Sequence, residues 1–287
     1  MRLLGVNTWV WTSPLTGDNA PDLLRHVARL GFSAVEIPLE NAGDLDPDVL
    51  RAVLNETGLV PCVVGAMAPG RDLVAASEED VRQTQDYLRA CVDLAAAVGA
   101  AAVCGPFYAA TGRVWRMSPD DRQAVYRELR RNLEPVVAHA VDAGVRIGIE
   151  PLNRYETSVI NTVAQGLEAL GPLLGDHLGL ALDTYHLNIE ERSSSAAVRL
   201  AGENLVHVQV CANDRGAPGG DQTDWTGLLA ALDEVDYQGP LVIESFTADN
   251  AAIATAASIW RPLAATQDDL ARDGLRHLEG LTHGGSS

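Results

Sequence analysis

Short apolar segments alternate with helical segments along the whole chain of 287 residues. Helical segments such as Glu78–Val98 and Ser118–Ala143 are followed directly by a glycine, the residue that most often ends a helix. Strict alternation without a linker predicts parallel strands in one domain, and eight repeats favour closure into a barrel over an open sheet. The expected strands are Leu3–Val6, Ala34–Ile37, Leu59–Val64, Ala101–Cys104, Val145–Ile149, Leu178–Leu182, Leu205–Val208 and Leu241–Ile243.

The sequence therefore predicts a single-domain α/β protein, a (β/α)8 TIM barrel over residues 1–280, followed by a disordered tail at 281–287. No GxGxxG or GxxxxGK[ST] motif occurs at a strand-to-helix turn, which weakens a nucleotide-binding alternative. The other expected helices are Pro21–Leu30, Pro47–Glu56, Thr162–Leu174, Leu187–Ala201 with an interruption at serines 193–195, Trp225–Val235, and a helical segment from Ala251 onward.

Composition excludes several classes of protein. The formal net charge of −18 opposes binding to nucleic-acid phosphate, which depends on clustered Lys and Arg. No run of about 18 or more apolar residues occurs, so no membrane span is expected, and the N-terminus lacks the pattern of a signal peptide. The scattered cysteines form no CxxC pair, which indicates buried, reduced thiols and a cytoplasmic location. They are Cys62, Cys91, Cys104 and Cys211.

Four consecutive strands in the second half of the chain each end at an oxygen-bearing side chain. The segment Val145–Ile149 leads into a glutamate and then Pro151, which cannot donate a ladder hydrogen bond, so the strand is expected to stop there. The carboxyl ends of barrel strands meet at one mouth. One such ending could be a helix cap or a salt bridge, but four in succession indicate a single site. The four side chains are Glu150, Asp183, Gln209 and Glu244.

Three carboxylates that lie close together raise one another's pKa unless a proton or a cation intervenes. A divalent cation bound by these four residues resolves the repulsion. Because all the donor atoms are oxygens, the set favours Mn²⁺ or Mg²⁺ over Zn²⁺. We expect Mn²⁺ as the cofactor, with Mg²⁺ or Co²⁺ as alternatives.

Further side chains are expected to contact a substrate. Glu156, His186 and Arg215 each lie a few residues beyond one of these strand ends. Glu36 lies inside the second strand, where it either faces the lumen or pairs with a cation, and Trp115 is expected to form an apolar wall of the pocket. Each also has a plainer interpretation: a structural histidine, a solvated arginine, a paired glutamate within a strand, or a tryptophan that packs between helices.

Four segments carry a resemblance to a known family. The segments are Asn153–Thr157 (NRYET), Leu182–Glu191 (LDTYHLNIEE), Asn213–Gly216 (NDRG) and Glu244–Phe246 (ESF). They resemble the ketose 3-epimerases, the D-tagatose and D-allulose 3-epimerase group of the xylose isomerase-like barrels. The resemblance implies an isomerase that epimerises C3 of a free ketose by deprotonation and reprotonation through a metal-stabilised enediolate. It also implies a homodimer or homotetramer.

The resemblance also implies roles for individual residues. Positions matching Glu150, Asp183, Gln209 and Glu244 bind the metal, and those matching Glu150 and Glu244 exchange protons with the sugar carbon from opposite faces. Positions matching Glu156, His186 and Arg215 hold the substrate oxygens at C1 to C3.

One departure keeps an alternative open. The 3-epimerases usually have histidine where this chain has Gln209, and some related dehydratases have glutamine there. A metal-dependent dehydratase or lyase, acting by β-elimination on a keto-sugar or keto-glycoside, is therefore the first alternative. A second alternative, from another class of protein, is a barrel that binds sugar without catalysis.

Overall fold

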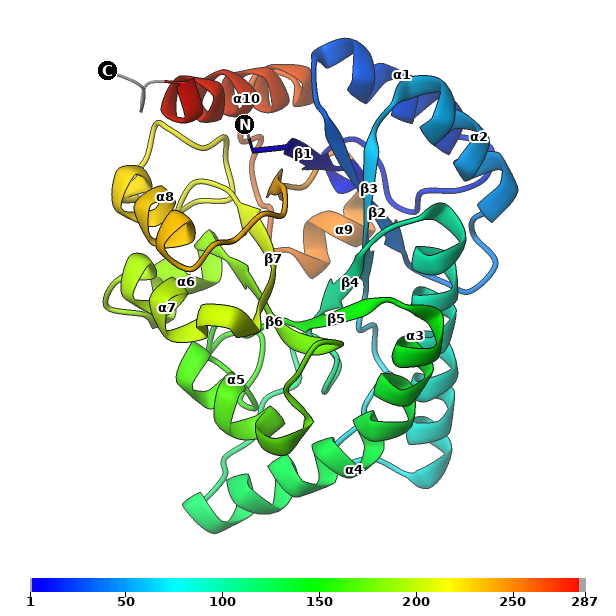
Figure 1. The fold of residues 1–287 in the computed structure, drawn as a ribbon, viewed down its shortest axis with the longest axis vertical. Coiled ribbons are helices and arrows are strands. Elements are labelled where there is room, and N and C mark those ends of the chain that lie inside the picture. Colours follow the sequence, from blue (N-terminus) through cyan, green and yellow to red (C-terminus); the bar gives the residue numbers. More distant parts are fainter. Residues whose placement is uncertain (1, 284–287) are drawn as a thin grey trace.

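The computed structural model describes residues 2–283 and shows a closed barrel of eight parallel strands (Figure 1). Neighbouring strands pair in chain order, and the barrel closes where Leu4 of the first strand pairs with Leu241 of the last. The predicted (β/α)8 barrel is confirmed. The strands are β1 (Leu4–Asn7), β2 (Ala34–Leu39), β3 (Val60–Gly65), β4 (Ala102–Gly105), β5 (Arg146–Ile149), β6 (Leu178–Asp183), β7 (Leu205–Val210) and β8 (Leu241–Ile243).

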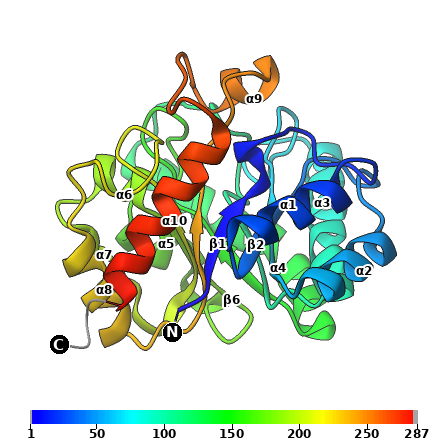
Figure 2. The ribbon, with the colours of Figure 1, turned by 90° about the horizontal axis from the view of Figure 1, so that it is seen from above.

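Helices surround the strands as an outer layer (Figure 1), while one short helix, α9, lies beyond the carboxyl ends of the strands (Figure 2). The α-helices are α1 (Ala20–Leu30), α2 (Pro47–Thr57), α3 (Glu78–Val98), α4 (Pro119–Ala143), α5 (Val163–Leu170), α6 (Thr184–Glu190), α7 (Ser194–Ala201), α8 (Trp225–Glu234), α9 (Ala251–Ala256) and α10 (Gln267–His283). The 3-10 turns are η1 (Thr8–Val10), η2 (Gly171–Leu173) and η3 (Gly202–Asn204).

The outer helices α1 to α4 begin and end within one residue of where the sequence predicts. At the start of α4, Ser118 and Asp121 form a reciprocal capping box that satisfies free backbone N–H groups. At its end, Gly144 has a φ of 68°, a left-handed conformation that glycine adopts without steric cost. Local chemistry therefore fixes where each β/α unit turns back toward the barrel.

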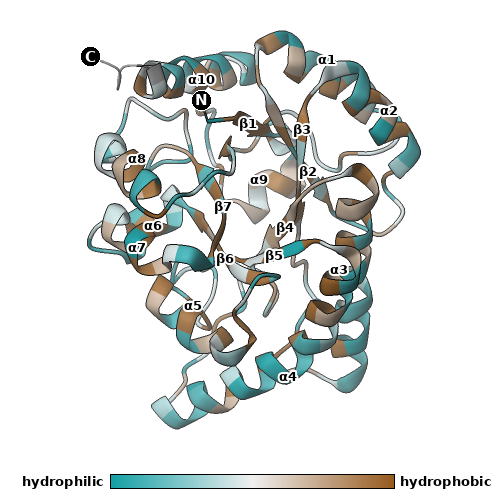
Figure 3. Cartoon of the chain, in the orientation of Figure 1, coloured by the Kyte–Doolittle hydropathy of each residue, from teal (hydrophilic) through white to brown (hydrophobic). Residues whose placement is uncertain are grey.

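The core lies between the barrel and its helices. The strands are mainly hydrophobic, whereas the outer faces of the helices are hydrophilic (Figure 3). Strand residues such as Val35, Ile37 and Ile147 are at most 1% exposed, which is typical of parallel strands covered on both faces. Among the described residues, no helix combines the length and apolarity that a membrane crossing requires.

Two helical expectations in the C-terminal half are wrong in detail. The segment from Ala251 onward is two helices, because residues 257–266 contain Ser258 at a φ of 57° and Pro262, which has no N–H to donate. The helix expected over Leu187–Ala201 begins earlier, at Thr184. Its expected interruption is confirmed but lies at residues 191–193 rather than 193–195, since Ser193 caps the start of α7 through its hydroxyl group.

Two expected boundaries also shift. The helix expected over Thr162–Leu174 ends earlier as α5, at Leu170, and continues as the 3-10 turn η2. The last helix, α10, continues to His283, so residues 281–283 of the expected tail are helical, and residues 284–287 lie outside the described residues.

Candidate active site

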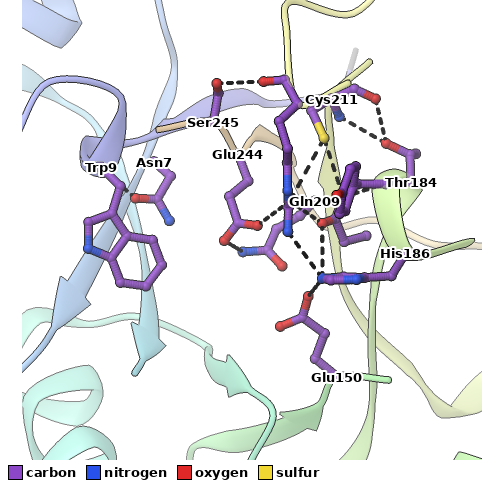
Figure 4. Close-up of polar contacts among 12 residues, drawn as sticks. Asn7, Trp9, Glu150, Thr184, His186, Gln209, Cys211, Glu244 and Ser245 are labelled. Carbon is purple, nitrogen blue, oxygen red and sulfur yellow. Dashed lines mark hydrogen bonds and ion pairs between the residues drawn. The ribbon is translucent and has the colours of Figure 1, made fainter. Parts of the chain in front are cut away.

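The four side chains expected to bind a metal meet at the carboxyl end of the barrel, and Figure 4 shows three of them, Glu150, Gln209 and Glu244. Glu150 directly follows β5 and Glu244 directly follows β8, while Asp183 ends β6 and pairs in register with Gln209 of β7. All four residues are buried, with at most 4% exposure. Carboxylate oxygens of Glu150 and Asp183 lie within 4.8 Å of each other. The structure therefore brings four oxygen donors into one buried space.

Arg215 lies at the centre of this group rather than in a solvated loop. Its Nη1 donates to Asp183 Oδ2 and, at 2.8 Å, to Glu244 Oε2. The guanidinium also lies over the ring of Tyr185, 4.1 Å from its centroid. Although burial opposes its charge, the carboxylates of Asp183 and Glu244 hold the pKa of Arg215 well above its usual value. Arg215 is thus a permanent positive charge within the site.

Burial raises the pKa of the three carboxyl groups. Burial is the largest cause for Glu150, and the negative charges of Glu244 and Asp183 add to it, so the pKa of Glu150 lies well above the usual range. Burial raises the pKa of Glu244 to about 8, although Arg215 opposes the shift. The pKa of Asp183 is raised for the same reason, again against the effect of Arg215. One guanidinium is therefore too little positive charge to keep all three groups ionised at neutral pH.

Two buried oxygen atoms support a bound cation. Glu150 Oε1 and Gln209 Oε1 accept no hydrogen bond from the described residues. A buried polar atom without a partner is rare in proteins, and a bound ion can supply the missing partner. Carboxylate and amide oxygens are also the ligands that Mn²⁺ and Mg²⁺ prefer. The residues present therefore fit a hard divalent cation.

His186 is held as a neutral imidazole. Burial and the charge of Arg215 lower the pKa of His186 well below its usual value. The backbone N–H of Asn153 donates to Nδ1 at 3.0 Å, and Nε2 lies 3.1 Å from Arg215 Nη2, which can only donate. Nε2 also lies 3.5 Å from Glu150 Oε1 and 3.6 Å from Asp183 Oδ2. His186 is therefore fixed beside the guanidinium and the carboxyl groups of the site.

A cavity of about 420 Å³ opens onto these residues. Glu150, His186, Arg215 and Glu244 contact one another on one part of its lining, and most of the other lining residues are apolar. Such a volume and such a mixture of surfaces are typical of small-molecule sites. A wider cavity of about 670 Å³, between α10 and residues 212–220, contains none of the expected site residues. The lining of the smaller cavity includes Trp9, Glu40, Val64, Met67, Glu150, Glu156, His186, Arg215, Glu244, Phe246 and Ile253.

The remaining expected substrate contacts occupy different places. Glu156 lines the cavity, and its Oε1 accepts a hydrogen bond from Asn153 Nδ2 at 2.7 Å. Trp115 is half-buried against the core beneath Arg113 and does not line the cavity. Glu36 is completely buried in β2, below the cavity, where its carboxylate faces other side chains.

Several residues of the site escaped the sequence interpretation. Asn153 contacts both His186 and Glu156, and its place three residues after Glu150 is a signal that the sequence contains. The hydroxyl group of Ser245 donates to the carbonyl oxygen of Arg215 at 2.6 Å and so fixes that loop. Asn7, whose Nδ2 lies 2.6 Å from Glu36 Oε2, has no signal beyond its place at the end of β1.

Comparison with known proteins gives consistent results. The family described as Xylose isomerase-like TIM barrel matches residues 24–281. A probable ketose 3-epimerase of Synechocystis is 31% identical over 274 residues, covering 96% of this chain and 94% of the relative. An L-ribulose 3-epimerase of Methylomonas is 29% identical, with 96% of each chain covered. The crystal structure of a D-allulose 3-epimerase from Methylomonas in complex with D-allulose superposes with a TM-score of 0.86 at 29% identity, covering 97% of each chain.

Proposed function

Since this chain belongs to the ketose 3-epimerases of the xylose isomerase-like TIM barrel family, we propose that it inverts the configuration at C3 of a free ketose with the help of a divalent cation. The observation that carries the proposal is the meeting of two buried glutamates, Glu150 and Glu244, in one cavity with a fixed guanidinium and a neutral histidine.

We assign the exchange of protons at C3 to Glu150 and Glu244. Both carboxyl groups line the cavity, and they approach it from different strands of the barrel (Figure 4). The pKa of both carboxyl groups is raised by burial, so each holds a proton more readily than a carboxyl group in water, which suits it to accept and return a proton. One glutamate removes the C3 proton, and the other returns a proton to the opposite face of the carbon.

The other polar residues on this part of the cavity lining bind and orient the substrate. The guanidinium of Arg215 offers N–H donors to the carbonyl and hydroxyl oxygens, His186 contacts these oxygens beside it, and the carboxylate of Glu156 accepts from a hydroxyl group. Glu150, Asp183, Gln209 and Glu244 would hold the cation. When bound, the cation would polarise the ketose carbonyl group and so acidify the C3 proton. Mn²⁺ is the expected ion, with Mg²⁺ or Co²⁺ as alternatives.

The charges that line the cavity favour a substrate without a phosphate group. Among the described residues that line it, Arg215 is the sole Arg or Lys, and its Nη1 is bound to Asp183 and Glu244. Glu40 adds a further carboxylate to the lining, held by Trp9 Nε1 at 2.9 Å. A phosphate group there would meet negative charge without a free cationic partner.

Incubation of the purified protein with Mn²⁺ and D-fructose, D-tagatose or L-ribulose in D2O tests the proposal. We expect the C3 epimer to form with deuterium at C3, detected by NMR. Glu150→Gln and Glu244→Gln should abolish both signals, whereas Glu203→Gln, on an exposed surface, should change neither. A dehydrated product from a 3-keto-sugar, without epimerisation of any ketose, would support the elimination alternative. Ligand binding without deuterium incorporation would support a non-catalytic barrel.

We also propose an assembly of two or four copies in the cytoplasm. The number of copies is proposed from the family resemblance. The cytoplasmic location is proposed from cysteine usage, because all four cysteines are free and buried. Light scattering coupled to size-exclusion chromatography measures the number of copies.

A further inference from the structure

The side-chain amide of Gln209 has its nitrogen fully engaged and its oxygen free. Nε2 donates to Glu36 Oε2 at 2.9 Å and to Glu244 Oε1 at 2.8 Å, which uses both of its protons. Oε1 is buried and accepts no hydrogen bond from the described residues. The amide nitrogen faces Glu244 (Figure 4). The orientation of this amide therefore decides whether an oxygen or an N–H₂ group faces the proposed cation site.

Glu36 is well placed to impose this orientation. It is completely buried in β2, and its carboxylate is held by donors from two other strands. Asn7 Nδ2 of β1 donates to Oε2 at 2.6 Å, and His207 Nε2 of β7 lies 2.7 Å from Oε1. Cys104 Sγ of β4 adds a weak contact with Oε1 at 3.7 Å. The carboxylate is thus fixed from several sides beneath Gln209.

A carboxylate accepts hydrogen bonds and does not donate them. With Glu36 beneath it, Gln209 must present Nε2 downward, because the reversed amide would set Oε1 against a carboxylate oxygen. A glutamine at position 36 would remove this restriction from below, since its own amide can donate or accept, and would leave Nε2 with Glu244 Oε1 as its carboxylate partner. The reversed orientation of Gln209, which presents N–H₂ to a cation, would then be more populated than in the wild type.

We propose that Glu36 is a positioning residue that fixes the amide of Gln209 with its oxygen toward the cation. This inference rests on the proposed function, because it requires a cation at the site. It differs from the substrate contact expected for Glu36 from sequence: Glu36 acts on the metal through Gln209 and does not touch the sugar.

Titration of the metal-free protein with Mn²⁺, followed by calorimetry and by the EPR signal of free Mn²⁺, tests the inference without any measurement of activity. We expect Glu36→Gln to weaken Mn²⁺ binding by about tenfold or more, the effect typical of residues that orient a metal ligand. Gln209→Leu removes the amide itself. In that background Glu36→Gln should cause little further loss, because no amide remains to be oriented.

The melting temperature of each metal-free variant shows that the barrel is still folded. The inference would be overturned if the Glu36→Gln variant bound Mn²⁺ as tightly as the wild type. It would also be overturned if Glu36→Gln weakened Mn²⁺ binding equally in the wild-type and Gln209→Leu backgrounds. A higher KM for the ketose with unchanged Mn²⁺ affinity would instead assign Glu36 to the substrate. Wild-type protein that binds no Mn²⁺ would overturn the proposed function as well, so the two failures are distinguishable.

Discussion

The two halves of the barrel end in different chemistry. Strands β5 to β8 end at or next to ionisable or amide side chains. Glu150 and Glu244 line the cavity, and Asp183 and Gln209 are hydrogen-bonded to the lining residues Arg215 and Glu244. Strands β3 and β4 end in Gly65 and Gly105, and the ring of Phe107 packs against both. From the first half the cavity receives mainly apolar surface, including Val64 and Met67. The second half therefore carries the reaction, and the first half mainly shapes the space beside it.

The largest expected effect comes from the half with the ionisable groups. Glu244→Gln should lower kcat for epimerisation by about 10²–10⁴-fold, since it removes one of two proton-exchanging groups. The substitution keeps the size of the side chain, so the melting temperature of the protein should change little. Initial rates measure this effect. If kcat of the Glu244→Gln variant fell by less than tenfold, the assignment of the chemistry to this half would be wrong.

Removal of the metal should also act on this half, and its effect should depend on pH. Glutamate in the unfolded chain has a pKa of about 4.3, and Glu244 has a raised pKa of about 8 in the folded protein. The proton on Glu244 therefore stabilises the metal-free fold fully below about pH 4.3, and this contribution is lost as pH rises through about 8. Mn²⁺ must displace such protons, so its affinity should rise by up to about tenfold per pH unit for each proton released.

Melting curves at pH 6 and pH 8, with and without Mn²⁺, measure this effect. The increase in Tm caused by Mn²⁺ should be larger at pH 8 than at pH 6. An increase that is the same at both values, or larger at pH 6, would contradict the assignment of raised pKa values to the metal ligands.

In the half that shapes the cavity, Gly105→Ala should reduce stability rather than chemistry. An added Cβ would lie 2.6 Å from Phe107 Cε1 and 2.7 Å from the carbonyl oxygen of Gly65, at a φ of 149°. We expect a loss of about 1–3 kcal/mol in the free energy of unfolding, measured by urea denaturation. Gly17→Ala, where no atom lies within 4 Å of the added Cβ, is the matched control and should leave the unfolding midpoint unchanged.

The smallest expected effect is at the apolar wall of the cavity. Ile253→Ala in α9 should raise KM for a ketose by about tenfold or less, with kcat nearly unchanged, because it removes apolar contact with the substrate. Val49→Ala on the exposed face of α2 serves as a control. If Ile253→Ala lowered kcat as strongly as Glu244→Gln, the assignment of chemistry to the ionisable groups and of shape to the apolar wall would be wrong.

The sequence predicts the two halves unequally well. The half with the ionisable groups is predictable because local residue types indicate where its strands end. An apolar run precedes Glu150 and Pro151, and similar runs precede Asp183 and Glu244. The apolar wall has no comparable mark, since Val64 and Met67 are ordinary core residues until the fold places them beside a cavity.

Long-range contacts limit what the sequence predicts about the site itself. Glu36 is visible as a charge within an apolar strand, but its partners His207 and Gln209 lie at separations of 171 and 173 residues along the chain. The central position of Arg215 depends on its own backbone conformation, with a φ of 69°. The residue types next to it do not predict that conformation. Position in space, rather than residue type, is the missing information in both cases.

The short helix α9 stands apart from the layer that stabilises the barrel. Four of its six residues are alanine, and Ala252, Ile253 and Ala256 border the cavity. Larger side chains there would shorten the space available to a sugar without any change to the proton-exchanging glutamates. For enzyme engineering, substitutions in α9 are therefore a way to select substrates by length while the proton-exchanging glutamates are kept.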